Sequence, residues 1–343
     1  MRRIKDINHV WLFFTDQCNL GCRYCFYKYR TQKQVITNKI FQNILEFIQP
    51  VSPVEFIFSG GEPLLEAQRL KEMIATISSR KLERYISVQT NATLLDVSLI
   101  KFFLFHRVNI EIGIDGDDET MLSNRPFLDS STDGPDLKRT VRLIQQKQSS
   151  FSTTMVVRPS GASKLYDNFR YLVSMGLKSI EIHPAFLERW DSDSSAIFLK
   201  QYRKACLWEL RNNLKGVIGR EYSEPSKGIW DLLVMPNGKV LGNWLLLSFP
   251  EKVRRFLYLM DFSDNSLNEK LRDQAEKYFQ SLDDYLRTRP ISSYRSISNF
   301  NAIYAIKTPF GEKYREKVFN YIDLCQRIEE IDRKIVYGAQ KIK

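Results

Sequence analysis

The stretch Thr15-Asp16-Gln17-Cys18-Asn19-Leu20-Gly21-Cys22-Arg23-Tyr24-Cys25 holds three of the five cysteines of this 343-residue chain. Three thiolates at this spacing can surround one metal centre and leave one coordination position open. The intervening Asn19, Gly21 and Arg23 are typical of a loop rather than of a buried strand. This cysteine loop, residues 18–25, therefore predicts a metal site.

Two other interpretations of the cysteine loop stay open. A closed zinc site would need a fourth ligand from a distant residue, and no candidate lies at zinc-like spacing. The candidates for that ligand are Cys206, Cys325, His9, His106 and His183. Alternatively, the three cysteines are unligated core residues.

A glycine-rich turn follows the next apolar run of the sequence. Residues 54–58 have the composition of a buried strand, and Ser59-Gly60-Gly61-Glu62-Pro63 comes directly after them. Two glycines let a backbone approach a ligand closely, and a carboxylate can accept hydrogen bonds from an ammonium group. Alone, this motif is also consistent with an ordinary strand-to-helix turn. Next to the cysteine loop, it favours a ligand site.

Together the two motifs resemble the radical S-adenosylmethionine (SAM) superfamily, whose C-x3-C-x-aromatic-C signature is matched by Cys18, Cys22, Tyr24 and Cys25. The resemblance covers roughly residues 9–215. It implies a 4Fe-4S cluster on the three cysteines, with the fourth iron chelated by SAM. One electron passed into the sulfonium would then release methionine and a 5'-deoxyadenosyl radical. An electron donor of the flavodoxin or ferredoxin type is implied as a partner.

The resemblance also assigns roles around the cofactor. It implies that Gly60, Gly61 and Glu62 hold the methionyl amino group and that Tyr24 packs near adenine. Relatives often carry Thr-Asn-Gly after the third strand, so Asn91 is a candidate cofactor contact and Ala92 is a departure. A helix-capping role for Thr90 or Asn91 is the alternative.

A further stretch, Ile114-Asp115-Gly116 followed by Asn124-Arg125, resembles the peptide-modifying and sulfatase-maturing (SPASM-type) branch of the superfamily. That branch has a serine where this chain has Gly113, and the serine is expected to contact SAM. Its loss puts the usual hydrogen bond in doubt. Arg125 best fits the motif as a partner of the SAM carboxylate. The alternatives are Arg139 and Arg158, for which surface ion pairs are the competing interpretation.

The order of apolar and amphipathic segments predicts an α/β fold. Six expected strands alternate with expected helices, which predicts a parallel sheet curved into a partial (β/α)6 TIM-like barrel over residues 1–215, with the site at the strand C-termini. The expected strands are 9–15, 54–58, 85–89, 108–114, 152–157 and 179–183. The expected helices are 40–48, 64–79, 96–105, 137–148, 164–175 and 194–215, of which 96–105 is capped by Asp96.

Residues 216–343 have a different pattern. A hairpin over 231–247 is predicted by its Asn237-Gly238 turn, and two helical segments are expected at about 265–287 and 311–337. The hairpin resembles the start of the extension that carries auxiliary iron-sulfur clusters in relatives. The corresponding run, 240–244, contains no cysteine. We therefore expect a degenerate SPASM- or twitch-like extension without auxiliary clusters.

Composition limits the class of protein. The net charge of +11 favours anionic partners, although no nucleic-acid motif accompanies it. Five cysteines with three clustered indicate a reducing compartment, and no run is long enough to span a bilayer. A cytoplasmic protein without membrane contact is the expectation.

The sequence predicts an enzyme that abstracts a hydrogen atom from a peptide or peptide-derived natural product. The expected outcome is a redox-neutral epimerisation or rearrangement, or the formation of a C-C or C-X bond. Two alternatives remain: an enzyme acting on a small anionic metabolite such as a phosphosugar or nucleotide, and an inactive iron-sulfur and SAM-binding regulatory module. Substrate contact by His183 and hydrogen donation by Cys206 or Cys325 are also open, with a packed core position as the alternative for each.

Overall fold

The computed structural model describes residues 7–27, 34–48, 53–80, 83–129, 137–146, 151–186, 188–214, 216–219, 230–241, 258–263 and 315–340. The chain forms two compact units. Unit 1 comprises Met1–Asn19, Phe26–Ile110 and Tyr222–Asn301. Unit 2 comprises Leu20–Cys25, Glu111–Glu221 and Ala302–Lys343. Each unit is therefore built from segments that are far apart in the sequence.

The sheet of unit 1 has β1 near its middle. Its strands are β1 (Ile7–Thr15), β2 (Val54–Gly60), β3 (Arg84–Thr90), β7 (Trp230–Val234), β8 (Lys239–Leu241) and β9 (Tyr258–Asp261). Their order is β3-β2-β1-β7-β8-β9, with β1 parallel to both β2 and β7, and with β8 antiparallel to both β7 and β9. The nearly continuous apolar runs of β1 and β2 are typical of strands buried in a parallel sheet.

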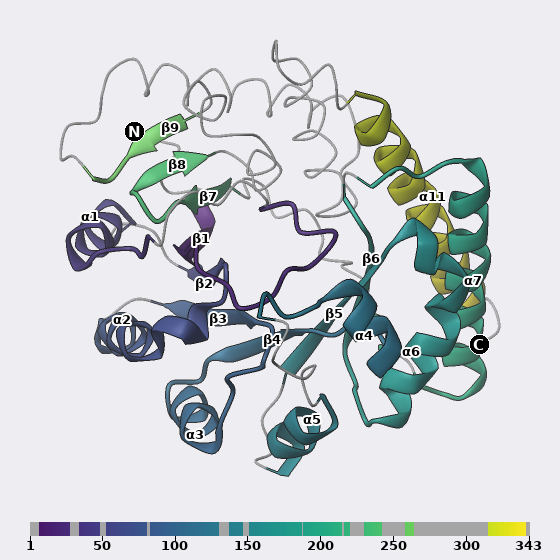
Figure 1. The fold of residues 1–343 in the computed structure, drawn as a ribbon, viewed down its shortest axis with the longest axis horizontal. Helices are drawn as coiled ribbons and strands as arrows, with labels where there is room; N and C mark the ends of the chain where they lie inside the picture. Colours follow the sequence, from purple (N-terminus) through teal and green to yellow (C-terminus); the bar gives the residue numbers. More distant parts are fainter. Residues whose placement is uncertain are drawn as a thin grey trace. The chain divides into compact units, whose positions relative to one another are not determined.

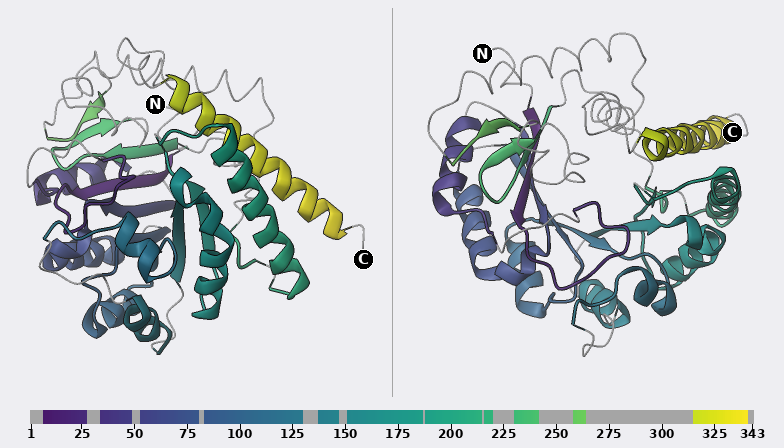
Figure 2. Two further views of the ribbon diagram at one scale, coloured as in Figure 1. Left: turned by 45° about the vertical axis from the view of Figure 1, so that its right-hand side comes forward. Right: turned by 45° about the horizontal axis from the view of Figure 1, so that its top comes forward.

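Helices cover one side of the strands β1 to β3 (Figures 1 and 2). They are α1 (Asn38–Ile48), α2 (Ala67–Ser79), which follows the 3-10 turn η2 (Pro63–Glu66), and α3 (Val97–Phe105). In α1 the buried side chains recur at helical spacing, so that one apolar stripe faces the core. The α3 helix begins after Asp96, whose side chain accepts a 2.7 Å hydrogen bond from the Leu99 amide.

Unit 2 combines a short parallel sheet with a helical layer. Its strands are β5 (Phe151–Val157), β6 (Ile180–Pro184) and the second half of β4 (Asn109–Gly113). Its helices are α4 (Asp118–Asn124), α5 (Leu137–Gln146), α6 (Leu165–Ser174), which follows the 3-10 turn η3 (Pro159–Lys164), α7 (Ser192–Arg211) and α11 (Arg315–Gln340). Tyr202 of α7 donates a 2.8 Å hydrogen bond to Asp332 of α11, and both residues are buried.

Most of the predicted elements are present, and the six strand-helix repeats are confirmed with ends shifted by a few residues. The structure adds α4 and β9, which the sequence analysis did not predict. The predicted hairpin is present as β7 and β8, but its first strand also pairs with β1, which was not foreseen. The helix predicted at 265–287 lies outside the described residues, and the boundary near residue 215 stays a prediction.

None of the helices in the described part of the chain has the length and apolar character required to cross a membrane.

Candidate functional site

The glycine-rich turn at the end of β2 packs directly against the start of the cysteine loop in unit 1. The Gly61 amide donates to the Thr15 carbonyl and the Glu62 amide to the Gln17 carbonyl, both at 2.7 Å. A Cβ on Gly61 would lie 1.8 Å from the Gln17 carbonyl oxygen, and one on Gly60, at φ +117°, 2.5 Å from that of Thr15. No other residue type fits these two positions without backbone movement.

Glu62 joins the end of β2 to the end of β3. Its carboxylate is 1% exposed and accepts hydrogen bonds from the Thr90 hydroxyl at 2.7 Å, the Asn91 amide at 2.7 Å and the Leu64 amide at 3.0 Å. Burial raises the pKa of Glu62, and the three hydrogen bonds oppose this only in part. The contact of Glu62 with a methionyl ammonium stays a prediction.

Asn91 connects β3 to the cysteine loop. Its side-chain amide donates to the Asn19 side chain at 2.8 Å, and its side-chain oxygen accepts from the Thr93 amide at 3.0 Å. The next residue, Ala92, has φ +63°, a left-handed conformation that favours glycine. The glycine that the family often carries at this position would adopt this conformation readily, whereas this chain adopts it with alanine.

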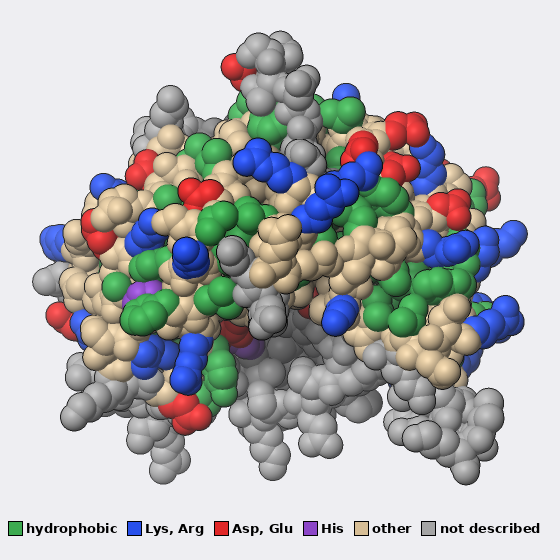
Figure 3. All heavy atoms as spheres, turned by 90° about the horizontal axis from the view of Figure 1, so that it is seen from below, with side chains coloured by type: hydrophobic (Ala, Val, Ile, Leu, Met, Phe, Trp, Pro, Cys, Tyr) green, Lys and Arg blue, Asp and Glu red, His purple; other side chains and the backbone are tan. Residues whose placement is uncertain are grey.

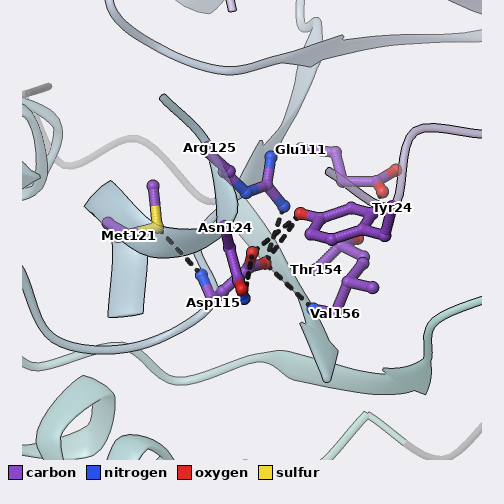
Figure 4. Close-up of polar contacts among 8 residues, drawn as sticks. All are labelled: Tyr24, Glu111, Asp115, Met121, Asn124, Arg125, Thr154 and Val156. Atoms are coloured by element: carbon purple, nitrogen blue, oxygen red, sulfur yellow. Dashed lines mark hydrogen bonds and ion pairs between the residues drawn. The ribbon is translucent and has the colours of Figure 1, made fainter. Parts of the chain in front are cut away.

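Unit 2 has a cluster of polar contacts of its own, centred on Asp115, which follows β4 (Figure 4). It is 1% exposed and accepts hydrogen bonds from the Tyr24 hydroxyl at 2.8 and 3.0 Å and from the Arg125 guanidinium at 2.8 Å. Asn124 and the Val156 amide donate to it at 3.2 and 3.1 Å. Asp115 and Asn124 were noted in the sequence only as parts of a motif, and neither was given a role.

Arg125 occupies the space left by the missing side chain at Gly113. A Cβ on Gly113 would lie 2.3 Å from Nη1 of Arg125 and 2.8 Å from its Cζ. The guanidinium is 5.4 Å from the Tyr24 ring centroid. Burial alone would lower the pKa of Arg125, but the charge of Asp115, assisted by Tyr24 and Cys22, raises it well above its ordinary value. Arg125 is therefore a buried, permanently charged side chain.

Tyr24 was expected to pack near adenine. In the structure its hydroxyl also donates a hydrogen bond to Asp115. Burial raises the pKa of its hydroxyl well above the ordinary value, Arg125 opposes this rise, and Asp115 reinforces it. The hydroxyl therefore stays protonated and donates to Asp115. Packing of Tyr24 against adenine stays a prediction.

Cys18, Cys22 and Cys25 are partly exposed, and none is in a disulfide. Cys18 belongs to unit 1, whereas Cys22 and Cys25 belong to unit 2. Among the described residues, no group of three or more His, Cys, Asp or Glu side chains is gathered closely enough to hold a metal ion. Joint ligation by the three cysteines stays a prediction that rests on the chemistry of the loop.

The remaining candidates lie elsewhere in unit 2. Cys206 in α7 is 0% exposed and Cys325 in α11 is 4% exposed. His183 of β6 lies 3.3 Å from Glu181 and is partly exposed. Arg158 forms a 3.0 Å ion pair with Glu188, as the ion-pair alternative expects.

Comparison with known proteins identifies the family. Residues 12–161, which include both the cysteine loop and the glycine-rich turn, match the sequence model of the radical SAM superfamily. The chain thus contains a radical SAM domain. The recognition made from the sequence is thus confirmed, and a 4Fe-4S cluster and SAM are the cofactors that characterise this superfamily.

Two relatives of this radical SAM chain carry named activities. It is 27% identical over 214 residues to the serine-type anaerobic sulfatase-maturating enzyme of Klebsiella pneumoniae, covering 55% of this chain and 53% of the relative. It is 31% identical over 117 residues to the S-adenosylmethionine-dependent nucleotide dehydratase of a Fibrobacter species, covering 32% and 34% of the two chains. The radical SAM chain thus spans about half, or less, of the curated relatives' length.

The fold of the radical SAM chain is similar to a solved structure described as native anSMEcpe with bound AdoMet and Cp18Cys peptide. The TM-score is 0.70, with 17% identity, and the match covers 98% of this chain and 99% of the other. This similarity confirms the predicted α/β partial barrel.

The cysteine loop and Arg125 have side chains of the kind that the cofactors of the radical SAM superfamily require. Thiolates are the usual ligands of iron-sulfur clusters, and the three cysteines of the loop are outside disulfides and partly exposed. Arg125 adds a buried guanidinium whose Nε atom finds no acceptor in the described part of the chain. The loop would hold the cluster, and Arg125 could face an anionic group.

Proposed function

We propose that this chain is a radical SAM enzyme that abstracts a hydrogen atom from a peptide or peptide-derived substrate. The observation that carries the proposal is the family match over residues 12–161, which includes the cysteine loop and the glycine-rich turn. The relationship to a sulfatase-maturating enzyme and the fold shared with a peptide-bound structure support a peptide substrate. When bound, the cluster and SAM would supply the 5'-deoxyadenosyl radical.

The chain's own residues would bind and orient the cofactors. Cys18, Cys22 and Cys25 would hold the cluster. Gly60 and Gly61 keep the β2 turn close to the loop, so that the methionyl end of SAM would meet backbone rather than side chains. The tightly packed turn would also restrict the access of water to the reacting groups.

A redox-neutral outcome, such as epimerisation or rearrangement, fits the composition of the chain. Only Cys325 lies beyond residue 216, so this chain cannot hold an auxiliary cluster there through several cysteines. A two-electron oxidation would need an electron acceptor at the site. A redox-neutral reaction needs none.

A small anionic metabolite is the second candidate substrate. The similarity to a nucleotide dehydratase and the net charge of +11 favour it. On the face drawn in Figure 3, however, basic side chains are interspersed with acidic and hydrophobic ones. On that face the basic side chains do not form a separate patch.

The test is anaerobic reconstitution with iron and sulfide, followed by SAM and dithionite, with 5'-deoxyadenosine quantified by chromatography. We expect deoxyadenosine from the native chain and none above background from Cys22→Ala. Cys206→Ala, which removes a buried cysteine outside the loop, is the matched control and should retain formation.

Peptides and nucleotides are then added in separate arms of the same assay. Peptide-stimulated deoxyadenosine formation would support the first candidate, and nucleotide-stimulated formation the second. An iron-loaded native protein that forms no deoxyadenosine would contradict the enzymatic proposal and favour a binding module.

A further inference from the structure

The second half of the cysteine loop, Leu20–Cys25, is held by one strip of chain in unit 2. This docking segment, Ser123–Phe127, begins in the last turn of α4. The Gly21 amide donates to the Pro126 carbonyl at 2.7 Å and the Arg23 amide to the Asn124 carbonyl at 2.9 Å. A bridge between Leu20 and Phe127 extends this ladder. The loop that carries Cys22 and Cys25 is therefore paired like a short strand.

A buried charge network fixes the same half-loop from its other side. Tyr24 donates its hydroxyl to Asp115, and Arg125, within the docking segment, donates to the same carboxylate. Asp115 lies at the end of β4 and also accepts from the β5 backbone at Val156. The half-loop, the docking segment and two strands thus meet at one carboxylate (Figure 4).

The network depends on the absence of a side chain at residue 113. A Cβ there would lie 2.3 Å from the Arg125 guanidinium, which would then have to shift from its present position 2.8 Å from Asp115. Displacing Arg125 would leave the Asp115 charge buried without its cationic partner, which is strongly unfavourable. Gly113 and Arg125 are therefore sterically matched.

We propose that Gly113, Asp115 and Arg125 are positioning residues that hold the Cys22-Tyr24-Cys25 half-loop in its folded conformation before any metal binds. Gly113 admits the guanidinium, the guanidinium neutralises Asp115, and Asp115 fixes Tyr24 between the two cysteines. The glycine at residue 113, where the family has serine, thus makes room for the Arg125 guanidinium. Its presence is therefore not a sign of lost function. The assignment of the half-loop as a cluster ligand rests on the proposed function, whereas its anchoring does not.

The first test is hydrogen exchange of the metal-free protein, followed by mass spectrometry with fragmentation to single amides. The reporters are the Gly21 and Arg23 amides, because both donate to the docking segment. Tyr24→Phe removes one oxygen atom and should speed their exchange about tenfold, as expected for a lost hydrogen bond to a charged group. Tyr166→Phe, in another largely buried tyrosine of unit 2, should leave them unchanged.

Gly113→Ala should also speed the exchange of the Gly21 and Arg23 amides. Its matched control is Gly161→Ala, because a Cβ on Gly161 meets nothing within 4 Å. In an Arg125→Ala background, Gly113→Ala should add little, since the guanidinium it would displace is gone. Should Gly113→Ala fail to fold, the Tyr24→Phe comparison still decides.

A second readout separates positioning from general stability. After reconstitution, the electron paramagnetic resonance spectrum of the reduced cluster should differ from the native spectrum in Tyr24→Phe and Gly113→Ala but not in the two controls. Unchanged Gly21 and Arg23 exchange in Tyr24→Phe would overturn the proposal, as would equal acceleration across all of unit 2. Because the exchange measurement uses metal-free protein, its result is independent of whether deoxyadenosine forms.

Discussion

At the scale of single residues, each unit contains a buried carboxylate that is hydrogen-bonded to segments of its own unit. Glu62 and Asp115 are each 1% exposed, yet their oxygens accept three and five hydrogen bonds, respectively. A buried carboxylate without hydrogen-bond donors would be strongly destabilising. The structure therefore explains both carboxylates as anchors between neighbouring segments.

Glu62→Gln should destabilise the protein by about 1–3 kcal/mol, because an amide offers one acceptor oxygen where the carboxylate offers two. Since burial raises the pKa of Glu62, the folded state binds this proton more tightly than the unfolded state. The stability difference between native and variant should thus shrink as pH rises through the carboxylate range. Urea unfolding over a pH series measures it.

The control for this prediction is Glu72→Gln, at an exposed position on α2 that should change stability by less than about 0.5 kcal/mol. If the native chain and the Glu62→Gln variant differed in stability by the same amount at every pH, the role given to burial would be contradicted.

The sequence identified the residues whose chemistry is local and missed those whose partners are distant. The cysteine loop and Gly60-Gly61-Glu62 were recognisable because each motif lies within a few consecutive residues. Asp115 was not, because its bond to Tyr24 joins positions 91 apart. Arg125 was assigned to a ligand, but its pairing with Asp115 depends on the space at Gly113, which only the folded chain reveals.

At the scale of elements, helix ends followed ordinary capping chemistry. Asp96 was expected to begin α3 and does so. The acidic cluster Asp117-Asp118-Glu119 could have indicated α4, since Asp117 caps that helix and the other two occupy its first turn. With only seven residues, α4 is too short to show a clear apolar period.

Asp96→Ala should lower the free energy of unfolding by about 1 kcal/mol, because the Leu99 amide loses its acceptor at the start of a nine-residue helix. Asp96→Asn keeps a capping oxygen and should stay close to the native value. Chemical denaturation of the three proteins measures the difference. Equal losses for Ala and Asn would mean that the charge, and not the cap, stabilises α3.

At the scale of the whole chain, local patterns predicted the elements but not all of their pairings. The Asn237-Gly238 turn predicted the β7-β8 hairpin, because a hairpin is a contact between neighbours in sequence. That β7 would also lie parallel to β1, more than 200 residues earlier, could not be inferred from either segment. Both edges of β1 are paired only when this distant segment is present.

A chain truncated after residue 215 should therefore aggregate, because β1 would expose the backbone edge that β7 otherwise pairs. A chain truncated after residue 264 retains β7, β8 and β9 and should scatter less light than the 1–215 chain at the same concentration, since both chains lack α11 and differ in whether the β1 edge is paired. Light scattering of the two purified chains measures the difference. A monodisperse 1–215 fragment would contradict this and support the boundary predicted from the sequence.

The late pairing of β1 also has a consequence during synthesis on the ribosome. β1 is translated more than 200 residues before its second neighbour, which lies at residues 230–234. At typical elongation rates, about 5–20 residues per second, that edge waits on the order of ten to forty seconds for its partner. We expect ribosome-associated chaperones to bind a nascent chain in which one edge of β1 stays unpaired for this time.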